Sequence, residues 1–126
     1  MVPTDRRYSK QHEWVLVSDD VATIGITHFA QDQLGDIVFV ELPEVHAELS
    51  RDEVMGTIES VKAVSEIFAP ISGTVLEVNT ELEATPETVN SDPNGAGWYC
   101  KMSIADPEDI ERLMDAAAYE QLTKEG

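Results

Sequence analysis

The sequence predicts a mainly β domain, a sandwich or barrel of short strands with one short internal helix and further helices near the C-terminus. About the first hundred residues contain several short runs of β-branched and aromatic residues separated by turn-forming residues, which is typical of sandwiches and barrels. A length of 126 residues suffices for one core but not for a catalytic domain beside a separate binding domain. We therefore expect a single domain over residues 1–126.

The strands are expected at regular intervals along the chain. Their predicted ranges are 12–17, 21–26, 36–42, 53–60, 63–68, 73–79 and 98–103. After the second strand, Thr27 can cap a short helix that runs to Leu34 and ends at Gly35, because glycine suits the left-handed exit of a helix. Residues 85–97 are rich in Pro, Asn, Asp and Gly and are expected to form a loop.

Two C-terminal helices are expected over about residues 106–122. Asp106 is a suitable N-cap, and Pro107 fits the first turn because its missing N–H would have no partner there. Apolar residues at helical spacing predict the buried faces of these helices. They are Ile110, Leu113, Met114, Tyr119 and Leu122.

The two strands at about residues 53–68 are expected to pair as a hairpin with Lys62 at its tip. Strict alternation puts two sets of side chains on opposite faces of the first strand. These sets are Val54, Gly56, Ile58 and Ser60 on one face, and Met55, Thr57 and Glu59 on the other. By spacing alone, Lys62 is a solvated charge that discourages edge pairing, or an amine presented for acylation.

The charge and the cysteine content exclude several classes of protein. A net charge of −17 argues against binding nucleic acid or an anionic membrane surface, since both need clustered Lys and Arg. The acids favour solubility or steering toward basic partner surfaces. No apolar run is long enough to span a bilayer, and no signal peptide is visible, so we expect a cytoplasmic protein. The single cysteine, Cys100, cannot form an internal disulfide and is expected to be buried and inert.

No catalytic motif is present. The chain lacks a nucleophile elbow, a phosphate-binding glycine loop, a dinucleotide fingerprint and a zinc-spaced His/Cys set. His12, His28 and His46 stand singly, as structural or surface histidines do, and are not expected to bind a metal. We expect a protein that is not an enzyme.

Five segments give the chain a family resemblance. They are YSKQHEWV (8–15), ATIGITHFAQDQLGDIVFVELPEV (22–45), GTIESVKAVSEIFAPISGTVLEVNTEL (56–82), PETVNSDPNGAGW (86–98) and AAAYEQL (116–122). Through them the chain resembles the H proteins of the glycine cleavage system, which carry a lipoyl group. The resemblance implies the barrel-sandwich hybrid fold of lipoyl and biotinyl carrier domains, extended by terminal helices, with lipoic acid attached covalently to Lys62.

The implied function is carriage of an aminomethyl group and of reducing equivalents. A PLP-dependent glycine decarboxylase loads the lipoyl arm, a tetrahydrofolate-dependent aminomethyltransferase unloads it, and dihydrolipoyl dehydrogenase reoxidises the dithiol. A lipoate ligase or an octanoyltransferase would modify the lysine, and a monomer is expected. The resemblance also implies a cleft in which Glu13 and Glu66, with Gln11 beside them, hold the amine of the loaded arm. Position 66 is commonly aspartate in this family.

The chain departs from the family pattern at two further positions. His46 stands where lipoyl domains usually have glycine, and relatives have a glycine near Arg51. If either turn needs a positive φ, a side chain there carries strain of about 1–3 kcal/mol.

Two other functions remain open at this level: an H-like paralogue that relays lipoyl groups to other proteins, and an unmodified interaction module. A biotin carrier is disfavoured, because such domains usually flank the lysine with methionines, where this chain has Val61 and Ala63.

Overall fold

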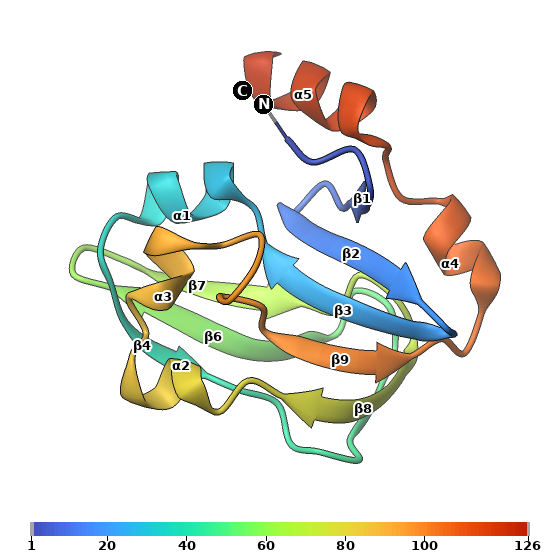
Figure 1. Ribbon diagram of the computed structural model, residues 1–126, viewed down its shortest axis with the longest axis horizontal. Coiled ribbons are helices and arrows are strands. Elements are labelled where there is room, and N and C mark those ends of the chain that lie inside the picture. Colours follow the sequence, from blue (N-terminus) through green and yellow to red (C-terminus); the bar gives the residue numbers. More distant parts are fainter. Residues whose placement is uncertain (1, 126) are drawn as a thin grey trace.

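The computed structural model describes residues 2–125 and shows a mainly β protein with two sheets that do not close into a barrel (Figure 1). One sheet has six strands in the order β1-β2-β3-β9-β8-β5, and the other has three in the order β4-β6-β7. The strands are β1 (Arg7–Tyr8), β2 (Glu13–Ser18), β3 (Val21–Ile26), β4 (Ile37–Glu41), β5 (Glu48–Leu49), β6 (Val54–Ser60), β7 (Val64–Phe68), β8 (Gly73–Val78) and β9 (Cys100–Ser103). The predicted fold class is confirmed.

All seven predicted strands are present, and their ends agree with the prediction to within two residues. The very short strands β1 and β5 were not predicted, because two residues carry no readable alternation. Both form by pairing with a longer strand: β1 pairs with β2, and β5 pairs with β8.

The internal helix α1 (His28–Leu34) has the predicted ends. The Thr27 side chain accepts a hydrogen bond from the N–H of Ala30, and Gly35 closes the helix with a φ of 83°. The prediction of a loop over residues 85–97 is wrong in part, because the short helix α3 (Thr88–Ser91) lies within it. Another short helix, α2 (Glu81–Ala84), was also missed, since four residues are too few for a helical pattern.

Two β-bulges change which side chains face outward. The register of β6 against β7 shifts between Val54 and Gly56, so the predicted alternation is wrong at the start of β6: Val54 is exposed and Met55 is buried. A second bulge in β4 lies between Ile37 and Phe39.

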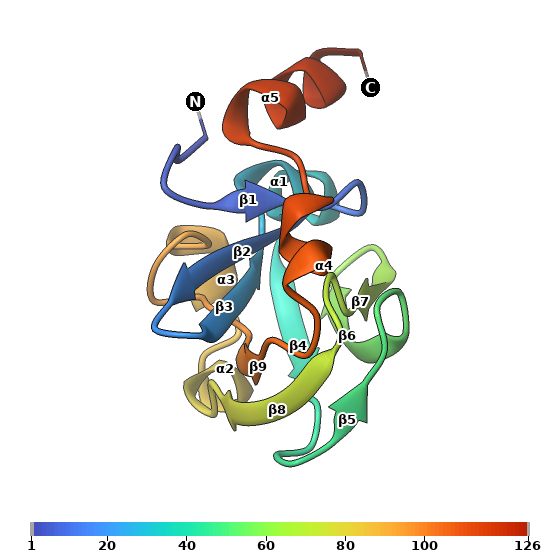
Figure 2. The same cartoon turned by 90° about the vertical axis from the view of Figure 1, so that its right-hand side faces the viewer.

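The core and the C-terminal helices form two packed clusters. Most buried apolar residues lie between the two sheets, whereas Tyr8, Trp14 and Tyr119 belong to a second cluster under helix α5 (Ala116–Glu125). The rings of Tyr8 and Tyr119 stack with centroids 4.7 Å apart. Figure 2 shows α5 lying across the end of the molecule that carries β1. None of the helices in residues 2–125 is long and apolar enough to cross a membrane.

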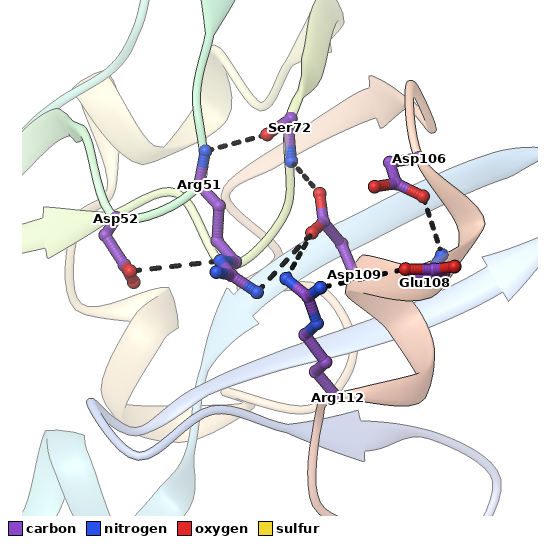
Figure 3. A network of polar contacts seen from close by, with 7 residues as sticks. All are labelled: Arg51, Asp52, Ser72, Asp106, Glu108, Asp109 and Arg112. Atoms are coloured by element: carbon purple, nitrogen blue, oxygen red, sulfur yellow. Dashed lines mark hydrogen bonds and ion pairs between the residues drawn. The ribbon is translucent and has the colours of Figure 1, made fainter.

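Helix α4 (Pro107–Glu111) is fastened beside the start of β6 by a polar network (Figure 3). The buried carboxylate of Asp109 accepts a hydrogen bond from the N–H of Ser72 at 2.9 Å. Its other oxygen lies 3.6 Å from Nη1 of Arg51 and 4.0 Å from Nη1 of Arg112. Two guanidinium groups and a backbone donor therefore compensate the burial of this charge.

Candidate functional site

Lys62 lies in the connection between β6 and β7, and its side chain is exposed. The hydroxyl of Ser60 organises this connection: Oγ accepts hydrogen bonds from the N–H groups of Lys62 at 3.3 Å and Ala63 at 3.0 Å. The N–H of Ser60 donates to the carbonyl of Ala63 at 2.8 Å. A buried serine thus supplies the closure that an Asn-Gly turn would otherwise provide.

The tip of the hairpin rests on the segment that joins α1 to β4. The N–H of Val61 donates to the carbonyl of Asp36 at 3.0 Å. The stem of Lys62 passes over Gly35, where a Cβ atom would lie 3.4 Å from Cε of the lysine. The positive φ of Gly35, and not this ordinary contact, favours glycine at the position. The backbone around Lys62 is therefore braced although its side chain is exposed.

Asn90 of α3 holds this supporting segment in place. Its Nδ2 donates to the carbonyl of Gly35 at 2.8 Å and to Oε1 of Gln31 at 2.9 Å. Its Oδ1 accepts from the N–H of Ile37 at 2.8 Å. One side chain from a distant part of the sequence thereby ties the end of α1 to the start of β4, beneath the tip that carries Lys62.

Glu13 is the most deeply buried carboxylate of the candidate cleft, with 1% of the residue exposed. Its Oε1 accepts from the hydroxyl of Ser9 at 2.5 Å, and its Oε2 accepts from the N–H of Phe68 at 3.4 Å. Burial raises the pKa of Glu13 to about 7, although both hydrogen bonds act in the opposite direction. Near neutral pH, this carboxyl group is therefore partly protonated and partly ionised.

Glu66 and Gln11 are placed differently from Glu13. Both are exposed, Glu66 on β7 and Gln11 in the turn before β2. Among residues 2–125, no hydrogen bond joins these three side chains to one another. Glu13 begins β2 of the six-stranded sheet, whereas Glu66 lies on β7 of the three-stranded sheet, two residues before Phe68, whose N–H contacts Glu13.

Sequence reasoning missed the residues that support these groups. Ser9 contacts Glu13 through both its hydroxyl and its backbone. Asn90 and Gly35 support the segment between α1 and β4 on which the tip with Lys62 rests. The positions of Asn90 in VNSDP and of Gly35 in QLGD were within segments quoted for the resemblance. Their roles depend on contacts across more than 50 residues of sequence, which no local pattern reveals.

Both departures from the family pattern lie in turns with positive φ. His46 has a φ of 77°, and Asp52, the residue after Arg51, has a φ of 73°. Because a positive φ disfavours residues other than glycine, these two turns carry backbone strain. Arg51 itself has a structural contact through Asp109, at the opposite end of β6 from Lys62.

Cys100 is buried, and burial raises the pKa of its thiol to about 12. It is therefore a packing residue, and its thiol is not reactive at neutral pH.

Comparisons with known proteins agree with this geometry. The family model described as "Glycine cleavage H-protein" matches residues 6–126. The chain is 55% identical to the glycine cleavage system H protein of Symbiobacterium thermophilum over 99% of this chain and 98% of that protein. It is 56% identical to the H protein of Bacillus subtilis over 98% of both chains. A crystal structure of the H protein from Mycobacterium marinum superposes with a TM-score of 0.91, at 38% identity, covering 98% of this chain and 99% of that one.

Proposed function

The chain belongs to the glycine cleavage H-protein family, and we propose that it carries its lipoyl group on the amine of Lys62. As a member of this family it is a carrier component of the glycine cleavage system and not a catalyst. The observation that carries the assignment to Lys62 is the exposure of this side chain on a tip whose backbone is held by Ser60 and Asp36.

The site fits an amide-linked cofactor. Acylation needs an amine that a modifying enzyme can reach, and within residues 2–125 Lys62 makes no ion pair that would have to be broken. A new amide bond joins Nζ to the cofactor carboxyl carbon, and the carboxyl's activating group leaves. The positive charge is lost, which costs the fold nothing where the amine has no acidic partner. We propose a lipoate ligase or an octanoyltransferase as the modifying enzyme.

When bound, lipoyl would supply a disulfide that accepts an aminomethyl group, and transfer of that group would leave a dithiol on the arm. The protein itself sets how far the arm extends and which residues its loaded end meets. About twelve bonds separate the lysine Cα from the first sulfur, which extend to about 15 Å at ordinary bond lengths. Glu66 follows Lys62 by four positions, a span of about 13 Å in extended chain. An arm laid along β7 therefore reaches Glu66, two residues short of Phe68, whose N–H contacts Glu13.

These carboxylates are suited to hold a primary ammonium. The exposed Glu66 can meet the ammonium at the surface, Gln11 can accept a further hydrogen bond, and the buried Glu13 can form a charge-assisted bond with less competition from water. An ammonium beside Glu13 would lower its pKa from about 7 and keep it ionised. Ser9 and the N–H of Phe68 would keep the carboxylate oriented.

The partners we propose are the enzymes of glycine cleavage: the glycine decarboxylase, the aminomethyltransferase and dihydrolipoyl dehydrogenase. The chain acts as a monomer that visits each in turn. Its localisation would follow theirs, in the cytoplasm.

Intact mass tests the attachment site. Protein made in cells supplied with lipoate should gain one lipoyl group, K62R should gain none, and K10R should behave as the wild type. An adduct that persists in K62R would reject Lys62 as the site. The lipoylated wild type should then support exchange of labelled bicarbonate with the carboxyl group of glycine by the decarboxylase. A lipoylated chain that fails in exchange would point to a relay role, and a chain that no enzyme lipoylates would point to an unmodified interaction module.

A further inference from the structure

An apolar surface surrounds Lys62 on the outer side of the three-stranded sheet. Among the large hydrophobic side chains of residues 2–125, the four most exposed are Val61 at 70%, Val64 at 63%, Phe39 at 53% and Val38 at 49%. The four next in exposure, elsewhere on the molecule, have 42–44%. Val61 and Val64 flank the lysine in sequence, and β4 pairs with β6 beside them.

The bulge in β4 creates half of this surface. Ile37 pairs with Ser60 and Phe39 pairs with Glu59, which leaves Val38 as the extra residue. Without the bulge, alternation would bury Phe39 together with Ile37. The bulge instead turns Val38 and Phe39 outward while Ile37 and Val40 remain in the core. The bulge thus directs two large apolar side chains into solvent, although their exposure does not stabilise the fold.

Acidic residues lie on the same outward face of the sheet as these apolar side chains. Phe39, Glu59 and Val64 lie opposite one another in one row across the sheet. The next row on the same outward face is Glu41, Thr57 and Glu66. We call this set the tip face: the apolar residues Val38, Phe39, Val61 and Val64, with the acids Glu41, Glu59 and Glu66. Figure 1 shows the β6–β7 connection projecting at one end of the molecule, beside the segment that joins α1 to β4.

Hydrogen bonds also order the backbone at the tip. Two hydrogen bonds to Ser60 Oγ and one to the carbonyl of Asp36 fix the backbone of residues 61–63. A surface that is already ordered loses little conformational entropy when it binds, so its apolar side chains can contribute fully to an interface. Exposed apolar groups gathered on one ordered face mark an interaction site more often than chance exposure does.

We propose that the tip face docks on the glycine decarboxylase, around the opening through which the Lys62 arm enters. This inference rests on the proposed function. The chemistry of the face requires a partner surface with an apolar collar, contacted by Phe39, Val61 and Val64, and with Lys or Arg outside it, opposite Glu41 and Glu59. The net charge of −17 would steer this protein toward such a basic surface. Val61 and Val64 lie within two residues of Lys62, so docking through them would bring the arm to the opening.

The first test removes apolar surface while keeping β-branched shape. The double variant V61T/V64T is compared with V17T/V54T, which makes the same change at two exposed valines outside the tip face. In the exchange assay with fully lipoylated protein, V61T/V64T should raise the KM for this protein by about tenfold, a difference of about 1.4 kcal/mol, with kcat within twofold. V17T/V54T should match the wild type. Equal KM values for the two double variants would overturn the proposal.

A second readout does not depend on the lipoyl group. Unlipoylated wild-type protein should compete with lipoylated protein for the decarboxylase, and unlipoylated V61T/V64T should compete about tenfold more weakly. E41Q/E59Q should weaken competition at low salt and flatten its salt dependence, whereas E83Q/E87Q, which alters two exposed acids elsewhere, should not. If unlipoylated V61T/V64T competes as well as the wild type, the tip face is not the docking surface. A wild-type chain that is never lipoylated at Lys62 would instead reject the proposed function.

Discussion

Replacing Glu13 by glutamine removes the buried charge while keeping the size of the side chain. Wild-type Glu13 has a pKa of about 7 in the fold, against 4.5 for a free glutamate. Because the folded-state pKa is the higher one, the folded protein binds more protons between these two values. The free energy of unfolding therefore falls as the pH rises from about 4.5 to about 7, and this loss levels off above that range.

The difference between the two pKa values corresponds to about 3 kcal/mol at one site. Other carboxylates of this acidic chain also titrate, so the informative quantity is the difference between variant and wild type. Urea unfolding of E13Q and of the wild type at pH 5 and at pH 8 measures it. Between these pH values, the free energy of unfolding should shift by about 2.5 kcal/mol in favour of E13Q.

E66Q is the matched control, since it removes one exposed carboxylate from a neighbouring strand position. It should follow the wild type at both pH values to within about 0.5 kcal/mol. If E13Q and the wild type show parallel pH dependence, Glu13 is not titrating in the neutral range. The assignment of a raised pKa, and with it the view that a loaded arm would ionise this group, would then be refuted.

Three further substitutions probe the scaffold. H46G should raise the free energy of unfolding in urea by about 0.5 kcal/mol, since a φ of 77° disfavours a side chain; no gain would mean that the turn carries no strain. G56A should lower it by about 3 kcal/mol, because a Cβ would overlap Tyr99 Oη and the carbonyl oxygen of Glu41; a stability equal to the wild type would contradict the close contact. N90A should destabilise by about 2 kcal/mol through three lost hydrogen bonds. It should also speed amide hydrogen exchange at Val61, whereas N79A, at a buried asparagine elsewhere in the fold, should leave exchange at Val61 unchanged in native conditions. Equal exchange in both asparagine variants would show that Asn90 does not brace the tip.

Local signals were sufficient wherever a residue acts on its immediate neighbours. The cap at Thr27, the exit at Gly35 and the cap at Asp106 all follow from side chains that contact backbone within a few residues. The exposed position of Lys62 followed in the same way from two strands and a short connection. Where a bulge interrupts alternation, as at Met55, the sequence pattern pointed to the wrong face, because an inserted residue is visible only against its partner strand.

The sequence by itself determined the strands, the family and the lysine that we propose as the attachment site. Tertiary structure alone decided what surrounds that lysine: the brace from Asn90, the outward turn of Phe39 and the burial that raises the pKa of Glu13. The physical reason is that periodicity and capping are set within a few residues. Desolvation, strand register and cross-chain hydrogen bonds arise only when distant segments meet.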